Sequence, residues 1–377
     1  MGAESPQAYL AAALELIREH ALHAGRVEWA QVTAQCETLA AHARTTAETY
    51  PALRHALQAL GDSHSHLRLP DAGQRQRGVI GLYFVGGVIA QVIPGSPADL
   101  AGLRPGDLIE AINGRVVGPG VNDGLLPDAT LTFDVRARGQ RRRLSLTRAD
   151  APLSSPVPEG RLIAPGVGLV TLPECGLDPA LPGGSTYQEA VRRLLLGLAG
   201  GGAGRWVLDL RLNLGGNMWP MLAGVGPLAG TGELGAFVRG RERWPWRYAD
   251  GAASIGDEVL CQTEGPSLPS LAEDVPIAVL ISPLTASSGE IITLSFLGRP
   301  GTRLFGEATR GLTTSNSLYE LSDGAALLIA TAHAADRSGR VFNGAIEPEV
   351  LIATNWAEFQ TAADPVLNVA LTWLAEA

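Results

Sequence analysis

The chain has 377 residues, of which 46% are hydrophobic and 18% charged, a composition typical of a globular protein with ample material for a core. Its net charge of −9 and the absence of a long basic stretch argue against a nucleic-acid-binding protein. The length favours two or three domains. The sequence contains no lysine, which excludes a lysine amine as a general base.

The three cysteines, Cys36, Cys175 and Cys261, are odd in number and far apart, unlike a disulfide framework or a metal site. We therefore expect reduced, buried thiols, and neither a metal nor another cofactor. The N-terminal segment lacks the basic start of a signal peptide, and no run of about 18 apolar residues occurs. These features predict no membrane span and a cytoplasmic location, or an exported protein if a leader has been removed.

The first part of the chain is expected to be helical, because apolar residues recur at spacings of three and four over residues 7–62. The short polar stretch "DSHSHLRLP" (62–70) follows. From about residue 78 the pattern changes to short strands separated by the turn signals "PGSP" and "RPGD". A stretch rich in proline and serine near residue 150 ends this region.

From about residue 160 onward, predicted strands alternate with predicted helices. The strands are "GVGLVTLP" (166–173), "RWVLDLRL" (205–212), "IAVLISP" (277–283) and "TRLFGEA" (302–308), and the helices cover 185–200, 288–298 and 364–377. This alternation predicts an α/β architecture.

The region of short strands resembles a PDZ domain. The stretch "GSPADLAGLRPGDLIEAINGRVV" (95–117) matches the bacterial pattern, and Gly81, Leu82, Tyr83 and Phe84 stand where such domains carry their carboxylate-binding loop. The resemblance implies that a peptide adds to an exposed strand edge while backbone N–H groups hold its terminal carboxylate. The alternative is a PDZ domain that only gates access or packs.

The rest of the chain resembles the carboxyl-terminal processing protease family, which includes the tricorn core and the nisin resistance protein. The matching segments are "LGDSHSHL" (60–67), "VLDLRLNLGG" (207–216), "AVLISPLTASSGEII" (278–292), "GEATRG" (306–311) and "GAIEPEV" (344–350). The resemblance implies a crotonase/ClpP-like mixed α/β core over residues 151–377, an N-terminal helical domain over 1–72 and an inserted PDZ β-barrel over 73–150.

The motif "PLTASSGE" carries the candidate nucleophile. In this family the reactive serine stands three residues before the acidic residue of the motif, and counting back from Glu290 gives Ser287. Ser288 would then contribute its backbone N–H to an oxyanion hole. A serine at a strand-to-helix turn adjoins the unpaired N–H groups of the helix N-terminus, which suit a developing oxyanion. The alternatives are a helix cap formed by the two serines, or Ser288 as the nucleophile.

The motif "LNLGG" supplies the second oxyanion donor by resemblance. We favour Gly216 and keep Gly215, since glycine lets the backbone approach a substrate without a Cβ in the way. The alternative is a plain turn. Asp209 and Arg211 are expected to hold this loop and not to react.

A serine hydroxyl needs a base to become a competent nucleophile. Many relatives use a lysine about 25 residues after the serine, but Leu312 occupies that position here. The tricorn and nisin resistance branch uses a histidine in an "SH" or "HS" context. By this resemblance His64 is the first candidate base, His66 is the second, and Ser63 would orient the imidazole. The alternative is a solvated polar loop.

The carboxylate that would orient the histidine is the part of the tricorn pattern that this sequence matches least. Phe342 stands where the tricorn pattern has a glutamate, and Glu307 and Glu347 are the other candidate acids. A Ser–His dyad assisted by Ser63 is therefore expected in place of a full tetrad.

The resemblance as a whole implies a serine peptidase that hydrolyses peptides or unfolded proteins through an acyl-enzyme on Ser287, with His64 as the base. The PDZ domain would bind substrate C-termini or gate access, and a homo-oligomer is compatible with the sequence. The second hypothesis is a non-catalytic protein on the same fold that binds hydrophobic ligands or peptides. A third is a PDZ scaffold with a relic peptidase domain.

Overall fold

The computed structural model describes residues 4–70, 79–118, 121–122, 130–137, 139–149, 156–264 and 275–377. They form two compact units. Unit 1 is built from Met1–Arg75, Phe237–Arg243 and Leu312–Ala334, and unit 2 from Gln76–Ala236, Trp244–Gly311 and Ala335–Ala377. The N-terminal helical segment thus shares its unit with strands from late in the chain, while the PDZ-like region and the α/β core share the other.

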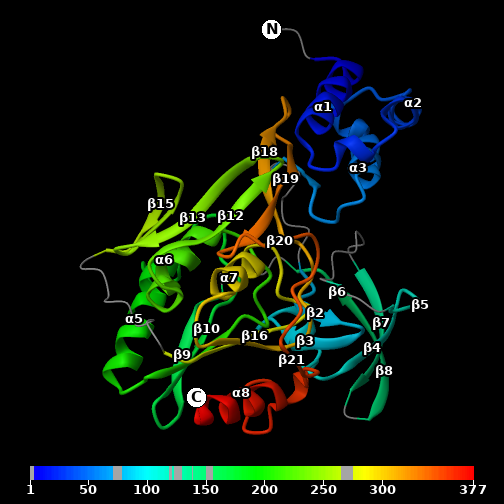
Figure 1. The fold of residues 1–377 in the computed structure, drawn as a ribbon. Coiled ribbons are helices and arrows are strands. Elements are labelled where there is room, and N and C mark those ends of the chain that lie inside the picture. The colour runs from blue at the N-terminus through cyan, green and yellow to red at the C-terminus, as the bar shows by residue number, and fades with distance from the viewer. Residues whose placement is uncertain are drawn as a thin grey trace. The chain divides into compact units, whose positions relative to one another are not determined.

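Unit 1 combines three helices with a small group of strands (Figure 1). Its elements are α1 (Pro6–His20), η1 (Ala24–Arg26), α2 (Trp29–Leu39), η2 (Thr46–Thr49), α3 (Tyr50–Ala59), β1 (His66–Arg68), β18 (Thr314–Glu320) and β19 (Ala326–Asp336), of which residues 326–334 belong to this unit. β19 pairs antiparallel with both β1 and β18. The helical character of residues 7–62 is therefore confirmed.

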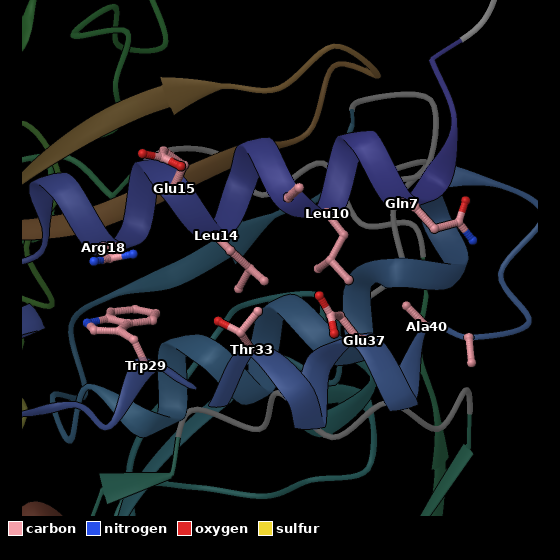
Figure 2. A pocket seen from close by; sticks show the side chains of 11 residues that line it. Gln7, Leu10, Leu14, Glu15, Arg18, Trp29, Thr33, Glu37 and Ala40 are labelled. Atoms are coloured by element: carbon pink, nitrogen blue, oxygen red, sulfur yellow. The ribbon is translucent and has the colours of Figure 1, made fainter. Parts of the chain in front are cut away.

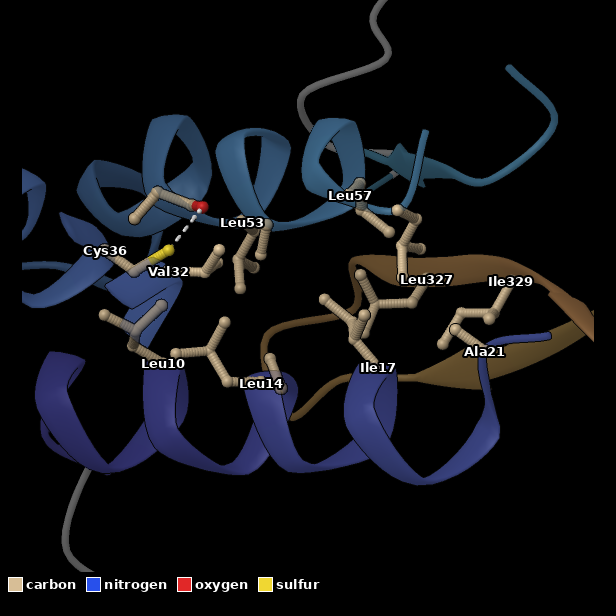
Figure 3. Packing of buried hydrophobic residues seen from close by; sticks show 14 of the residues in the cluster. Leu10, Leu14, Ile17, Ala21, Val32, Cys36, Leu53, Leu57, Leu327 and Ile329 are labelled. Atoms are coloured by element: carbon tan, nitrogen blue, oxygen red, sulfur yellow. Dashed lines mark hydrogen bonds between the residues drawn. The ribbon is translucent and has the colours of Figure 1, made fainter. Parts of the chain in front are cut away.

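The core of unit 1 forms where the apolar faces of the helices meet β19 (Figure 3). Leu10, Leu14 and Ile17 follow one face of α1, at the spacing that a helix requires. The residues they pack with come from the other elements: Val32 and Cys36 of α2, Leu53 and Leu57 of α3, and Leu327 and Ile329 of β19. Burial of these side chains fixes the helices on the strand that also supports β1.

A groove of about 490 Å³ lies between α1 and α2 (Figure 2). Leu10 and Leu14 point into it from α1, Thr33 and Glu37 face them from α2, and Arg18 and Trp29 lie at one end. Because the groove separates the two helices, each of them packs more extensively against α3 than against the other.

The cysteines are free thiols, as expected, and two of them are buried. Cys36 donates to the carbonyl oxygen of Ala52 at 3.2 Å, and burial raises its pKa. Burial also raises the pKa of Cys175, to about 12, and of Cys261, to about 11. Cys261 is only partly buried, so the prediction of buried thiols is correct for Cys36 and Cys175 alone.

Two histidines in unit 1 predict a loss of stability in mild acid. The ring centres of His23 and His333 lie 5.7 Å apart. Burial lowers the pKa of both histidines below the usual 6.5, and the positive charge of Arg26 lowers it further. For His23, the negative charge of Asp62 opposes these effects but is smaller. Since the folded-state pKa is lowered, the stabilisation is fully present above about pH 6.5. It is lost as the pH falls through the folded-state value.

Urea unfolding at pH 7.5 and at pH 5 measures this effect as a difference in the free energy of unfolding. A histidine whose pKa is one unit lower in the folded state than in the unfolded state contributes about 1.4 kcal/mol to this difference. The variant His333→Gln should show a weaker pH dependence than the wild type. His42 is exposed, so His42→Gln is the matched control. An equal pH dependence in wild type and His333→Gln would contradict the prediction.

The PDZ-like region of unit 2 is a single sheet with the strand order β6-β2-β3-β4-β7-β8, and β5 pairs with β4. Its elements are β2 (Leu82–Val85), β3 (Val88–Val92), α4 (Pro97–Leu100), β4 (Leu108–Ile112), β5 (Arg115–Val116), β6 (Val121–Asn122), β7 (Thr130–Ala137) and β8 (Gln140–Thr147). Alternate residues of the strands, such as Leu82, Phe84 and Phe133, form a separate apolar core.

The α/β core of unit 2 is built on a six-stranded sheet. Its order is β21 (Val350–Leu351), β17 (Thr302–Gly306), β16 (Ile277–Ile281), β11 (Arg205–Asp209), β10 (Val167–Thr171) and β9 (Glu159–Ala164). All neighbours are parallel except β9 and β10. All five residues of β16 are buried, as expected for a central parallel strand.

Helices cover both faces of this sheet (Figure 1). α8 (Pro365–Glu376) packs on one face, while α5 (Tyr187–Gly200), α6 (Met218–Ala229) and α7 (Ser288–Phe296) lie on the other. This arrangement confirms the predicted α/β fold class. None of the helices that the structure describes is long and apolar enough to cross a membrane.

Several elements of unit 2 were not predicted. Among them are α6, β9, β12 (Gly232–Arg239, of which residues 232–236 belong to unit 2), β13 (Glu242–Ala249, of which residues 244–249 belong to unit 2), β14 (Ala252–Ile255), β15 (Glu258–Gln262), β20 (Val341–Phe342), β21 and η3 (Trp356–Glu358). α6 contains Pro220 and Pro227, and all its residues except Trp219 are buried, so neither its composition nor its periodicity indicates a helix.

The PDZ-like sheet contacts the α/β core within unit 2. Tyr83, Val85 and Val88 pack in one apolar cluster with Leu284 and Trp356. Leu284 belongs to the loop that leads to Ser287. The PDZ-like sheet therefore supports this loop from outside the catalytic core.

Candidate active site

Two loops meet at one edge of the α/β sheet. The candidate oxyanion loop (residues 210–217) follows β11, and the serine loop (residues 282–287) follows β16. β11 and β16 are parallel neighbours, so the loops that follow them leave from the same edge. The hydroxyls of Ser282 and Thr285 donate to the carbonyl oxygens of Arg211 and Leu210, at 2.6 and 2.9 Å. These bonds join the two loops before either reaches its functional residues.

Ser287 occupies a sharp turn between β16 and α7. Its φ of 51° and ψ of −118° lie in a region that residues with a Cβ rarely adopt. Such strain persists only where the surrounding structure holds it, and a strained strand-to-helix turn is the geometry that exposes a nucleophilic serine. Ser287 is half-buried, whereas Ala286 and Ser288 beside it are buried.

Glu290 holds the backbone of this turn. It is fully buried, and one carboxylate oxygen accepts the N–H of Ser287 at 2.8 Å. The other accepts the hydroxyl of Thr309 at 2.5 Å and the N–H of Gly311 at 2.8 Å. Because Glu290 lies in the first turn of α7, the helix dipole also favours its negative charge. The segment "GEATRG" is thereby tied to the serine loop.

The side chain of Ser288 faces the oxyanion loop. Its hydroxyl donates to the carbonyl oxygen of Gly216, and the residue is 8% exposed. The two serines thus have different environments: Ser287 lies on the strained turn, and Ser288 joins α7 to the loop after β11.

Gly215 and Gly216 differ in what their N–H groups bind. The N–H of Gly215 donates to the side-chain oxygen of Asn213 at 3.0 Å. Among the described residues, the N–H groups of Gly216 and Ser288 have no acceptor. This geometry favours Gly216 over Gly215 as the partner of Ser288 in an oxyanion hole.

The conformation at Gly216 requires glycine. Its φ is 94°, and a Cβ at this position would lie 1.8 Å from the carbonyl oxygen of Cys175. Cys175 brackets the loop, since its N–H donates to Gly215 and its carbonyl accepts the N–H of Asn217. The loop therefore approaches the segment after β10 too closely for any side chain.

The buried side chain of Arg211 holds the start of the oxyanion loop in place. Its guanidinium donates to Asp209 and Asp364 at distances of 2.8 to 3.0 Å and lies 4.5 Å from the centre of the Phe359 ring. Burial would raise the pKa of Asp364, but the hydrogen bonds and charge of Arg211 outweigh it and lower that pKa. The network connects β11 to the start of α8 and has a bracing function, as the sequence predicts for Asp209 and Arg211.

His64 belongs to unit 1, in the loop between α3 and β1. Its Nδ1 lies 2.6 Å from the hydroxyl oxygen of Thr314, the first residue of β18. Asp62 accepts the N–H of His64 at 3.0 Å and that of Ser65 at 2.6 Å, and Asn316 donates to the carbonyl of His64 at 3.0 Å. The loop is therefore fixed at its backbone and at its imidazole.

The structure places the other two residues of the predicted base motif differently. Ser63 is exposed, and among the described residues its hydroxyl has no hydrogen-bond partner. Thr314, and not Ser63, lies against Nδ1 of His64. His66 is exposed, and its Nδ1 donates to the carbonyl oxygen of His64 at 3.0 Å.

The candidate acids Glu307 and Glu347 lie in unit 2. The carboxylate of Glu307 accepts the N–H of Thr354 at 2.8 Å, which anchors the segment after β21. Glu347 is exposed, and Phe342 is buried. Neither glutamate belongs to the unit that holds His64.

Part of β2, the candidate peptide-binding strand of the PDZ-like region, already pairs with another strand. Leu82 and Phe84 point into the PDZ core, and Tyr83 packs toward Trp356. β6 pairs antiparallel with β2 through Phe84 and Val85.

Comparison with known proteins identifies the core. The family model described as peptidase family S41 matches residues 166–352, and the model described as a PDZ domain matches residues 88–123. Residues 166–352 belong to peptidase family S41. The S41 region contains the candidate oxyanion loop, the serine loop and Glu290.

The relatives agree with this identification. A nisin-resistance protein of Lactococcus lactis subsp. lactis is 32% identical over 146 residues, which cover 38% of this chain and 45% of that protein. The chloroplastic carboxyl-terminal-processing peptidase 2 of Arabidopsis thaliana is 27% identical over 258 residues, which cover 65% of this chain and 45% of that protein. The matches thus span less than half the length of either relative.

The solved structure of a photosystem II D1 C-terminal processing protease shares the fold. It matches with a TM-score of 0.60 and 20% identity, over 93% of this chain and 94% of that one. The family models and the relatives confirm the predicted resemblance to carboxyl-terminal processing proteases with a PDZ domain.

Three residues of the site were not predicted from the sequence. Glu290 served only as a landmark for counting, although its carboxylate holds the serine turn. Asn213, inside "LNLGG", distinguishes the two glycines through its side chain. Thr314 carries no sequence signal, because its contact with His64 joins positions 250 residues apart.

Proposed function

We propose that this protein is a serine peptidase in which Ser287 attacks a peptide carbonyl and His64 accepts the hydroxyl proton. The observation that carries the proposal is the turn at Ser287, with two unpaired N–H groups, those of Gly216 and Ser288, beside it. This combination serves acyl transfer, because negative charge develops on the carbonyl oxygen as the serine adds.

The buried polar bonds around the turn make the donors rigid. Asn213 fixes Gly215, and the Ser288 hydroxyl fixes the Gly216 carbonyl. The oxyanion donors would therefore stand in place before substrate arrives, so little reorganisation is required at the moment of reaction. The α7 dipole adds positive potential at the same point.

His64 is the proposed base because its Nδ1 lies against the hydroxyl of Thr314, which makes Nε2 the nitrogen that would accept the serine proton. Without lysine in the chain, the lysine base of many relatives is excluded. After attack, the imidazolium would return the proton to the leaving amine, and water would hydrolyse the acyl-enzyme on Ser287.

For the PDZ-like region we propose a substrate-handling role. By its match to the PDZ domain model it would hold substrate C-termini, and its contact with Leu284 connects it to the serine loop. Peptides and unfolded proteins are the proposed substrates.

Labelling with a fluorophosphonate probe tests the proposal, since only an activated serine reacts. Peptide mapping by mass spectrometry should find the adduct on Ser287 in the wild type and in Ser288→Ala, and no adduct in Ser287→Ala. Absence of labelling in the wild type, or an adduct on Ser288, would contradict the assignment and favour a binding protein on this fold.

A further inference from the structure

We infer that Thr314 is the residue that positions the base. Its neutral hydroxyl binds Nδ1 of His64, as a carboxylate does in a Ser–His–Asp triad. The inference rests on the proposed function of His64. It adds a third member that the sequence motifs do not indicate, from strand β18 of unit 1.

The geometry is that of a strong hydrogen bond. Nδ1 of His64 and Oγ1 of Thr314 are 2.6 Å apart, a short distance for a nitrogen and an oxygen. Thr314 lies opposite His333 in the β18–β19 ladder, so its backbone is held by the sheet. As a β-branched residue it has few rotamers, which keeps the hydroxyl in place.

The chemistry requires one direction of this bond. A neutral imidazole carries one N–H, and a general base needs a lone pair on Nε2, so Nδ1 must carry the proton and donate to Oγ1 of Thr314. Thr314 is half-buried, and its own O–H can donate to water. When Nε2 takes the serine proton, Nδ1–H continues to donate to the same oxygen, which then stabilises the imidazolium.

The surrounding loop makes the imidazole position depend on Thr314. Asp62 binds the N–H groups of His64 and Ser65, and its second oxygen accepts the Ser65 hydroxyl at 2.9 Å. That hydroxyl accepts the N–H of Ala330 of β19 at 3.0 Å. Asp62 thus fixes the backbone of the loop, whereas Thr314 fixes the rotation of the ring.

The first test is Thr314→Val, which removes the hydroxyl but keeps the shape and the strand preference of the side chain. We expect kcat for a fluorogenic peptide to fall about 10- to 100-fold with little change in KM, because the lost bond strengthens when the imidazole becomes charged. Thr314→Ser retains the hydroxyl and should recover most of the activity.

The second test is Thr314→Asp, which places a negative charge near Nδ1. A carboxylate favours the charged imidazolium, so the acid limb of the kcat/KM profile should move to higher pH. A residue with a merely structural role would not shift this limb.

The matched control is Thr331→Val. Thr331 lies in β19, and its hydroxyl bonds the hydroxyl of Ser317 at 3.1 Å and the carbonyl oxygen of Ser315 at 3.4 Å, so this variant removes a comparable hydroxyl from the same pair of strands. It should leave kcat unchanged, and thermal unfolding should show similar stability for both valine variants.

Wild-type kcat in Thr314→Val, together with an unshifted acid limb in Thr314→Asp, would overturn the inference. That result would leave the proposed function intact as long as Ser287→Ala is inactive and His64→Ala is impaired. Full activity of His64→Ala would instead remove the proposed base and Thr314 with it, and fluorophosphonate labelling would then show whether Ser287 is still the nucleophile.

Discussion

Replacing Ser287 by alanine should reduce kcat/KM for peptide hydrolysis by about 10⁴-fold or more, because the attacking oxygen is lost while the oxyanion donors remain. Alanine carries a Cβ like serine and meets the same φ of 51°, so the turn should not change in strain. Cleavage of a fluorogenic peptide or of casein measures the effect, and thermal unfolding should show a folded protein with only a small loss of stability, because Ser287 is also the N-cap of α7.

Ser288→Ala provides the comparison for that result. The variant loses the bond from the Ser288 hydroxyl to the carbonyl of Gly216 but keeps the backbone N–H that is the proposed oxyanion donor. We expect a loss of about 10-fold, in line with one hydrogen bond that positions the loop. Equal inactivation of both alanine variants would show that the structure does not distinguish the serines in the way proposed.

His64→Ala should lower kcat/KM by about 10²- to 10⁴-fold, the usual contribution of a general base. The residual activity should lose the acid limb of the pH profile that the wild type shows. Added imidazole should restore part of the activity, since the missing ring leaves space for a base of the same kind. Steady-state kinetics from pH 5 to 9, with and without imidazole, measure both effects.

His66→Ala is the control for the base, because His66 is exposed and its Nδ1 is used by the carbonyl of His64. It should keep most of the activity and the wild-type acid limb. The reverse result, an inactive His66→Ala beside an active His64→Ala, would exchange the two roles. A result with both variants fully active would point to a base outside this loop.

Local patterns predict the helices of unit 1 and the buried strands of the S41 core. Apolar residues at helical spacing give α1 and α3, and the continuous apolar run of β16 gives a central parallel strand. The strands β12 to β15 and the helix α6 lack such patterns. All residues of α6 except Trp219 are buried, and the helix contains two prolines, so its helical state depends on neighbours that a sequence window does not include.

The sequence by itself determined the serine loop, the glycine pair and the exclusion of a lysine base. These features are encoded locally, as turn residues at fixed spacings and as composition. The tertiary structure decided which glycine keeps its N–H unpaired, since that depends on the side chain of Asn213. It also decided that Thr314 contacts His64, because a hydrogen-bond partner is chosen by which strands and loops become neighbours and not by their separation in the chain.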